Sequence, residues 1–140
     1  MKHVVFTDKN KDELTNIALG MQTMVIRATQ SRRIPHSRVF KGETLYFTKK
    51  GSNKVNYTAE VKEVYNYNKL LNSEIDNIIN KNKNKLMIED KELEKYKKKC
   101  ICLIEFENVK SIDTININPQ ASLVDWIILN DIEDIEQKSV

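Results

Sequence analysis

Four arginines lie close together in one segment of the chain, and they are the residues whose type and spacing best suggest chemistry. They are Arg27, Arg32, Arg33 and Arg38, whereas the nineteen lysines are scattered. Arg carries a planar fork of donors that can grip a phosphate or a base edge in two places, which Lys cannot do. The segment therefore predicts contact with nucleic acid. The alternative is a solvated basic loop, or one that pairs with acidic residues elsewhere.

Other polar residues near this cluster support the same interpretation. His36 lies within it, and Lys49 and Lys50 follow shortly after. Such side chains suit a phosphate backbone, and their affinity would depend on salt through counterion release. Arg27 differs from the rest because it ends an alternating segment, which would aim it into a cleft. The alternative for Arg27 is a structural ion pair with Glu105 or Glu107.

Charge is unevenly distributed along the 140 residues. Residues 1–68 carry a net charge of +6, residues 69–99 carry +3, and residues 100–140 carry −6, which gives the total of +3. Asymmetry of this kind bears on partners and not on fold. An acidic C-terminal third could be a solvated tail or a surface for another protein.

Metal and nucleophilic chemistry find little support in the sequence. Cys100 and Cys102, even with His3 and His36, lack the usual spacing of zinc ligands, so we expect free buried cysteines and no metal site. His36 has no evident nucleophile beside it, and there is no glycine-rich phosphate loop. We therefore expect no catalytic residues and no cofactor.

Alternation of apolar and polar residues predicts several strands. In residues 22–28, Met24, Ile26 and Ala28 face one way, while Thr23, Val25 and Arg27 face the other. Residues 44–48 and 55–64 predict a hairpin, and residues 100–106 a buried strand that continues over 109–117 after a turn at 107–108. Residues 123–129 fit either a strand or a short helix.

Helical patterns fill the gaps between these strands. A short helix is expected to start from a cap at Asn10, with Glu13 three residues later, and to end at Gly20. Residues 69–99 predict a helical insertion. The whole chain, residues 1–140, then reads as a single α+β domain with about five strands in a small, partly closed mixed β-barrel.

The segment from Gly20 to Arg27 resembles the signature of ASCH domains, a branch of the PUA-like superfamily related to EVE and YTH-type domains. That signature reads Gly-x-Lys-x-x-Glu-x-Arg after a short helix; Gly20 and Arg27 match, while Gln22 and Val25 replace its Lys and Glu. Residues 39–47 and 57–64 resemble the two elements that follow in the family. The resemblance covers about residues 8–107.

This resemblance implies a PUA-like barrel whose cleft lies beside the early strand, with Gln22, Thr23 and Arg27 as cleft residues. Such domains commonly bind RNA or a modified nucleobase, and aromatic side chains surround the base in related members. Tyr46 and Trp126 are our candidates for base stacking. Some ASCH members are hydrolases or ribonucleases, but Gln22 and Val25 supply neither a nucleophile nor a base at the positions concerned.

Three hypotheses follow from these observations. The first is a module that binds RNA or a modified nucleotide through a basic cleft. The second is a small hydrolase or nuclease that uses His36 and one carboxylate, and we leave catalysis open while favouring binding. The third is a protein-interaction domain that uses the acidic C-terminal third. We expect a cytoplasmic protein with no membrane contact, because no apolar run approaches the ~20 residues of a membrane span; its oligomeric state stays open.

Overall fold

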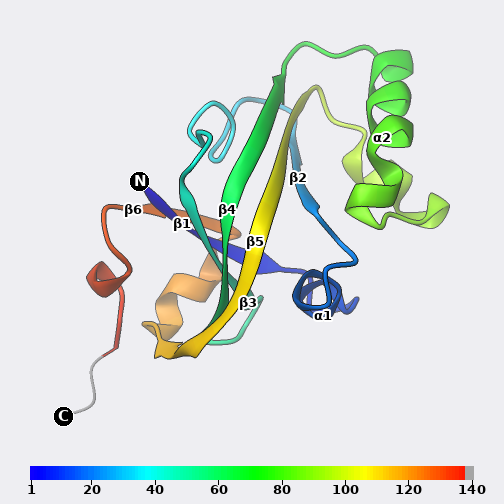
Figure 1. The fold of residues 1–140 in the computed structure, drawn as a ribbon. Coiled ribbons are helices and arrows are strands. Elements are labelled where there is room, and N and C mark those ends of the chain that lie inside the picture. The colour runs from blue at the N-terminus through cyan, green and yellow to red at the C-terminus, as the bar shows by residue number, and fades with distance from the viewer. Residues whose placement is uncertain (138–140) are drawn as a thin grey trace.

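The computed structural model describes residues 1–137 and forms one six-stranded sheet (Figure 1). The strands are β1 (Lys2–Thr7), β2 (Met24–Thr29), β3 (Thr44–Lys49), β4 (Lys54–Tyr67), β5 (Cys100–Asn116) and β6 (Trp126–Leu129). Their order in space is β2-β5-β4-β3-β1-β6; β1 and β3 run parallel, and the other neighbours antiparallel. The sheet curls into a half-barrel, which confirms the predicted α+β class and barrel architecture with one more strand than expected.

The two faces of β2 pack into different cores, as the alternation predicted. Val25 belongs to a buried cluster to which all six strands contribute, with Phe47 and Trp126 among its largest members. Met24 and Ile26 belong to a second cluster with the helical insertion. A strand that is apolar on both faces needs cover on both sides, and the curl of the sheet and the insertion supply it.

The early helix, α1 (Glu13–Ala18), is shorter than its sequence pattern. Asp12, not Asn10, holds the N-cap position, and the Glu13 carboxylate accepts a hydrogen bond from the Asp8 amide at 2.9 Å. The prediction of Asn10 as the cap was therefore wrong. Gly20 lies just past the helix with a φ of +76°, a left-handed conformation that glycine adopts without strain, so the predicted stop is confirmed.

The predicted insertion consists of α2 (Asn72–Leu86) and the 3₁₀ segment η1 (Asp90–Tyr96). Ile75, Ile79 and Leu86 on one face of α2 bury against β2 and β5. Two ion pairs connect η1 with the chain between β1 and α1: Lys11 with Glu92 at 3.0 Å, and Lys95 with Asp8 at 3.2 Å. The insertion thus covers one face of β2 and reaches the end of β1 (Figure 1).

Strand β5 is one continuous element of 17 residues, not two strands separated by a turn. Asn108 lies within it with a φ of +57°, and its pairing with β4 shifts register at three places. Such bulges bend a strand without ending it. The turn residues that suggested a break at residues 107–108 therefore mark an irregularity in a long, curved strand.

The C-terminal part contributes η2 (Pro119–Leu123), β6 and η3 (Ile132–Asp134). Residues 123–129, left open between strand and helix, contain the edge strand β6, which pairs with β1. Within residues 1–137, no helix combines the length and apolar character needed to cross a membrane.

Candidate functional site

A cavity of about 420 Å³ opens beside the C-terminal end of β1 and the middle of β2. Its lining consists of residues 6–10, 26–28 and 95–96, together with Glu13, Lys50 and Asp125. We call it the Arg27 cavity. Its volume lies within the roughly 300–1,000 Å³ of small-molecule sites.

Arg27 is anchored in this cavity by backbone carbonyls. Its Nη1 donates to the Ile26 carbonyl and its Nη2 to the Phe6 carbonyl, both at 2.9 Å. The Nε atom is buried without a hydrogen-bond partner among residues 1–137. Because a guanidinium carries five N–H groups, the two anchoring bonds fix its orientation and leave donors for a ligand.

Arg27 pairs with neither of the two alternative partners considered for it: Glu107 is exposed on β5, and Glu105 is engaged elsewhere. Glu105 lies in a buried position on β5 and accepts a hydrogen bond from Lys85 at 2.8 Å. That hydrogen bond raises the pKa of Lys85. The ion pair of Arg27 with Glu105 is therefore not formed in this structure.

Trp126 supports Arg27 and is itself held by a buried histidine. The Arg27 Cζ lies 5.5 Å from the centroid of the Trp126 ring, a cation–π geometry. Trp126 Nε1 donates to His3 Nδ1 at 3.0 Å, and His3 Nε2 lies 2.9 Å from Glu43 Oε1. Since His3 Nδ1 accepts, Nε2 carries the proton and donates to Glu43. Burial lowers the pKa of His3 against the opposing effect of Glu43, which fits this neutral tautomer.

Two lysines in the cavity are paired with aspartates. Lys50 Nζ donates to Asp125 Oδ1 at 2.8 Å, and this bond lowers the pKa of Asp125. Lys95 Nζ lies 3.2 Å from Asp8 Oδ2. Burial would raise the pKa of Asp8, but hydrogen bonds from the Asn10 amide and Lys95 lower it. The lowered pKa values keep both aspartates ionised at neutral pH.

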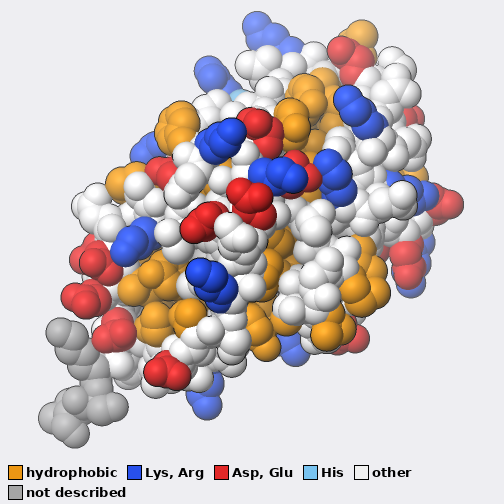
Figure 2. Space-filling view, viewed as in Figure 1, with side chains coloured by type: hydrophobic (Ala, Val, Ile, Leu, Met, Phe, Trp, Pro, Cys, Tyr) orange, Lys and Arg blue, Asp and Glu red, His pale blue; other side chains and the backbone are white. Residues whose placement is uncertain are grey.

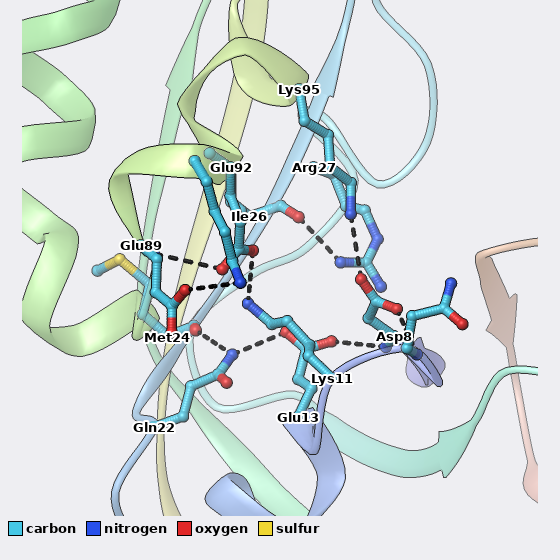
Figure 3. Close-up of polar contacts among 12 residues, drawn as sticks. Asp8, Lys11, Glu13, Gln22, Met24, Ile26, Arg27, Glu89, Glu92 and Lys95 are labelled. Carbon is cyan, nitrogen blue, oxygen red and sulfur yellow. Dashed lines mark hydrogen bonds and ion pairs between the residues drawn. The ribbon is translucent and has the colours of Figure 1, made fainter.

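Glu13, which lines the same cavity, is hydrogen-bonded to the buried Gln22 (Figure 3). Gln22 Nε2 donates to Glu13 Oε2 at 2.9 Å and to the Met24 carbonyl at 3.0 Å. Glu13 lines the Arg27 cavity, whereas Gln22 and Thr23 line a second cavity between the C-terminal end of α1 and residues 105–109 of β5. Of the three cleft residues expected from the resemblance, Arg27 alone lines the first cavity.

Of the other basic residues predicted to bind nucleic acid, Lys50 alone lines the Arg27 cavity. Arg32, Arg33, Arg38 and Lys49 are exposed, while Lys50 lines the cavity. His36 is buried, and its Nε2 lies 3.0 Å from the Tyr67 carbonyl and its Nδ1 2.8 Å from Ser37 Oγ. His36 therefore packs the loop against β4 and has no open ring nitrogen for a ligand.

The two stacking candidates occupy packing positions. Tyr46 is half-buried against a core cluster around Val4 and Phe6. Trp126 is 3% exposed, with Arg27 over its ring. Neither lines the Arg27 cavity; its aromatic lining residues are Phe6 and Tyr96.

Several residues of the cavity gave no signal in the sequence. Lys95 and Tyr96 come from the insertion, and Lys95 meets Asp8 across 87 positions of the chain. Local patterns do not indicate where an insertion will fold back. Asp125 directly precedes Trp126, a predicted site residue, and this adjacency was the one sequence feature that placed Asp125 near the site.

The charge of the Arg27 cavity is mixed. Its lining includes four basic residues (Lys9, Arg27, Lys50 and Lys95) and three acidic ones (Asp8, Glu13 and Asp125). Figure 2 likewise shows basic and acidic side chains interspersed on the face that it presents. The predicted basic cleft is therefore not confirmed by this mixed lining. Residues 1–137 hold no cluster of three or more His, Cys, Asp or Glu that could bind a metal ion.

Comparisons with known proteins bear on the fold. No protein-family model and no curated protein matches the chain. The crystal structure of ASCH from Zymomonas mobilis is similar with a TM-score of 0.69 and 12% identity, covering 95% of this chain and 90% of that one. A variant of the same protein gives a TM-score of 0.70 over 95% of this chain and 91% of its own. The resemblance inferred from Gly20 to Arg27 is thus supported by the structure, and the chain has the fold of these ASCH structures.

Proposed function

We propose that this protein binds RNA, or a nucleotide that carries a modified base, in the Arg27 cavity. The observation that carries the proposal is the Arg27 guanidinium, which lines the cavity, is fixed by two carbonyls and by Trp126, and uses only one N–H of each Nη for that anchoring. A preoriented fork of donors suits a phosphate group or the acceptor edge of a base. The ASCH-like fold makes nucleic acid the natural class of ligand.

The lysines of the cavity have a matching role. Lys50 and Lys95 form ion pairs with Asp125 and Asp8, so a phosphate could take the place of either carboxylate as the partner of an ammonium group. Tyr96 lines the same space and provides a ring against which a base could stack. In this proposal Arg27 and Tyr96 select the base, and the lysines bind phosphate.

The exposed arginines extend this surface beyond the cavity. Arg32, Arg33 and Arg38, with Lys49, are free to contact the backbone of a longer strand. Exposed, long basic side chains fit phosphate contacts, which position a strand without reading its sequence. A mononucleotide would then use the cavity alone, and an oligonucleotide would use both.

Binding fits the chemistry of the cavity better than hydrolysis. Burial alone would lower the pKa of Lys95, but Tyr96 and Asp8 outweigh it and raise that pKa, so the amine is charged and not nucleophilic. Asp8 has a lowered pKa and is correspondingly a weak base. His36, the base considered for an enzyme, uses both ring nitrogens outside the cavity.

The proposal is tested by fluorescence anisotropy with labelled RNA and DNA oligonucleotides of one sequence, at several salt concentrations. We expect binding that weakens with salt, and a several-fold loss of affinity in Lys50→Ala. The matched control is Lys81→Ala, an exposed residue of α2 outside the cavity, which should bind as the unmodified protein does. Equal affinity in all three proteins, or no binding at any salt, would contradict the proposal and favour a protein-interaction role.

A further inference from the structure

The end of the sheet that lies opposite α1 brings together three segments that are distant in sequence (Figure 1). The loop after β2 is hydrogen-bonded to the end of β4, where the Ser37 amide donates to Asn66 Oδ1 at 2.9 Å. The start of β5 joins both: the Lys99 amide donates to Gln30 Oε1 at 3.4 Å, and the Lys99 carbonyl accepts from the Leu70 amide at 3.1 Å. The side chains of these three segments therefore share one end of the molecule.

Six basic side chains on these segments form no ion pair within residues 1–137, where the ion pairs involve other groups. We call the six residues the basic end: Arg32, Arg33, Arg38, Lys69, Lys98 and Lys99. Lys98 is half-buried, and the others are exposed. Unpaired cations at a surface are available to an anionic partner.

Few carboxylates offset this charge. The three segments contain no Asp or Glu over residues 29–42, 64–73 and 97–104. Among the five carboxylates that flank them, Glu94 and Glu105 each pair with a lysine outside the basic end, and Glu43 pairs with the amino terminus. Glu63 and Glu74 are exposed. The region thus keeps an excess of positive charge, unlike the mixed lining of the Arg27 cavity.

The loop holds its arginines on a frame of buried residues. Pro35, His36 and Val39 are buried, and His36 Nε2 lies 3.0 Å from the Tyr67 carbonyl oxygen. The His36 amide donates to the Arg33 carbonyl at 2.9 Å, which closes a turn of the loop. A loop that is ordered before binding loses less conformational entropy when a ligand docks.

Phe40 adds an exposed aromatic ring to this loop. Its side chain is 61% exposed and packs into none of the three buried clusters. The Phe40 backbone is fixed, because its amide donates to Glu43 Oε1 at 2.8 Å and its carbonyl accepts from the Glu43 amide at 3.1 Å. Val39 is buried between Arg38 and Phe40, so both of those side chains face outward. An aromatic face beside cations suits an unpaired base next to its phosphate, and a duplex offers no such base.

We propose that the basic end binds a single strand of nucleic acid, with its cations on the phosphates and Phe40 stacked on one unpaired base. The stacked base makes this surface select single strands over duplex, whereas phosphate contacts alone would accept both. The inference goes beyond the function proposed above, since it adds Phe40 and three lysines and needs no base in the Arg27 cavity.

Fluorescence anisotropy tests the lysines with a labelled oligonucleotide of about 12 nucleotides, a length within the site sizes of single-strand-binding domains. The test variant combines Lys69→Asn, Lys98→Gln and Lys99→Gln; Asn tolerates the φ of +51° at Lys69. Three lost phosphate contacts should weaken single-strand binding at least about tenfold and lower the slope of log affinity against log salt by ~2.

The control for these lysines combines Lys54→Gln, Lys81→Gln and Lys110→Gln, which remove the same charge at exposed positions outside the basic end. Its affinity and salt slope should stay close to those of the unmodified protein. Equal affinities in the two triple variants would overturn the proposal.

Phe40→Leu tests the stacked base. The substitution keeps an apolar side chain and removes the ring, so single-strand affinity should fall about tenfold while duplex affinity stays unchanged. Strands with one 2-aminopurine, placed at each position in turn, report the stacking: the unmodified protein should quench its fluorescence at a preferred position, and Phe40→Leu should not. Leu123→Ala, at an exposed apolar residue of η2, is the control. Equal affinity of the unmodified protein for strand and duplex, or the same quenching in Phe40→Leu, would refute the inference.

Lys50→Ala separates this surface from the Arg27 cavity, because Lys50 lines that cavity. Weaker binding in Lys50→Ala with unchanged binding in the triple variant of the basic end would refute the basic end and leave the cavity. The reverse result would support the basic end and contradict the cavity. Polyglutamate should compete with the strand only weakly; competition as strong as that of the unlabelled strand would indicate unselective attraction of anions and refute the inference.

Discussion

Arg27 on β2 lies over the indole of Trp126 on β6, with its Cζ 5.5 Å from the ring centroid. Trp126 is fixed in turn by its hydrogen bond to His3, and His3 by Glu43. The position of Arg27 in the cavity thus depends on a hydrogen-bonded series of three residues, Trp126, His3 and Glu43, of which Glu43 is the one that is partly exposed. Substitutions in this hydrogen-bonded series should therefore alter both the stability of the protein and its affinity for a ligand.

Trp126→Phe should lower both the unfolding free energy and the affinity for nucleotides. The variant leaves His3 Nδ1 buried without its donor, which costs ~1–3 kcal/mol of unfolding free energy. Phe is also a weaker cation–π partner than Trp, so the orientation of Arg27 loosens and nucleotide affinity falls. Urea denaturation and anisotropy measure the two effects. Phe47→Leu, in the same core cluster, is the control and should lower stability while affinity stays unchanged.

Stability should fall as pH decreases from about 7 toward 5, because of His3. Burial lowers the pKa of His3 from 6.5, so below pH 6.5 the unfolded chain binds a proton that the folded protein resists. The unfolded state then holds more protons, and unfolding free energy decreases with falling pH until the folded-state pKa is reached. Urea unfolding at several pH values should show this slope.

His3→Gln provides the test of that assignment. The Gln amide can still donate to Glu43 but does not titrate, so the slope between pH 5 and pH 6.5 should flatten. Below pH 5, the unfolding free energy of both the unmodified protein and His3→Gln should fall further. Burial would raise the pKa of Glu43, but hydrogen bonds from His3, the N-terminus and the Phe40 amide lower it, and this stabilisation disappears as the carboxylate is protonated. An unchanged slope in His3→Gln would assign the pH dependence to other groups.

The sequence predicted the strands well because their alternation is local. Val25 and Arg27 share one face of β2 and Met24 and Ile26 the other, as two-residue periodicity requires. The insertion was also recognisable from helical spacing around Ile75 and Ile79. Irregularities were harder, because a bulge at Asn108 and a turn use the same residue types.

The cavity was less predictable, because its partners are distant in sequence. Arg27 could be identified from its place at the end of an alternating segment. Its anchors are the carbonyl of Phe6 and the ring of Trp126, and a carbonyl leaves no trace in side-chain patterns. Lys95 reaches Asp8 only because the insertion folds back over β2. The sequence pattern therefore identified Arg27, whereas the residues that surround it in the cavity are brought there by tertiary packing.

Both cysteines should resist thiol reagents in the native protein. Cys100 and Cys102 are free and buried in the structure, and burial raises the pKa of Cys102 to about 12. Because the thiolate is the reactive form, the folded protein should react with Ellman's reagent far more slowly than the unfolded chain. Rapid reaction of two thiols without denaturant would contradict the packing of β5.

Replacing Arg32 and Arg33 by Ala together should weaken nucleic-acid binding and reduce its salt dependence. Each lost contact with a single-strand phosphate removes ~0.7 from the slope of log affinity against log salt. Stability should barely change, because both side chains are exposed. The control is Lys81→Ala with Lys110→Ala, which removes two exposed charges outside the Arg27 cavity. Unchanged binding with reduced stability would make the two arginines structural.

Arg27→Lys should reduce the discrimination between modified and unmodified bases more than it reduces the overall affinity for oligonucleotides. Lysine keeps the positive charge, but a single ammonium cannot hold both the Ile26 and Phe6 carbonyls and still present a fork to a ligand. A bidentate contact with a base edge supplies ~1–3 kcal/mol of discrimination, so differences in affinity among oligonucleotides with modified and unmodified bases should shrink by that amount. Anisotropy at fixed salt measures these differences.

Arg38→Lys, at an exposed loop position, is the control and should alter affinity for all ligands alike. Equal weakening toward every ligand in Arg27→Lys would identify Arg27 as a phosphate contact, and unchanged binding would remove it from the site.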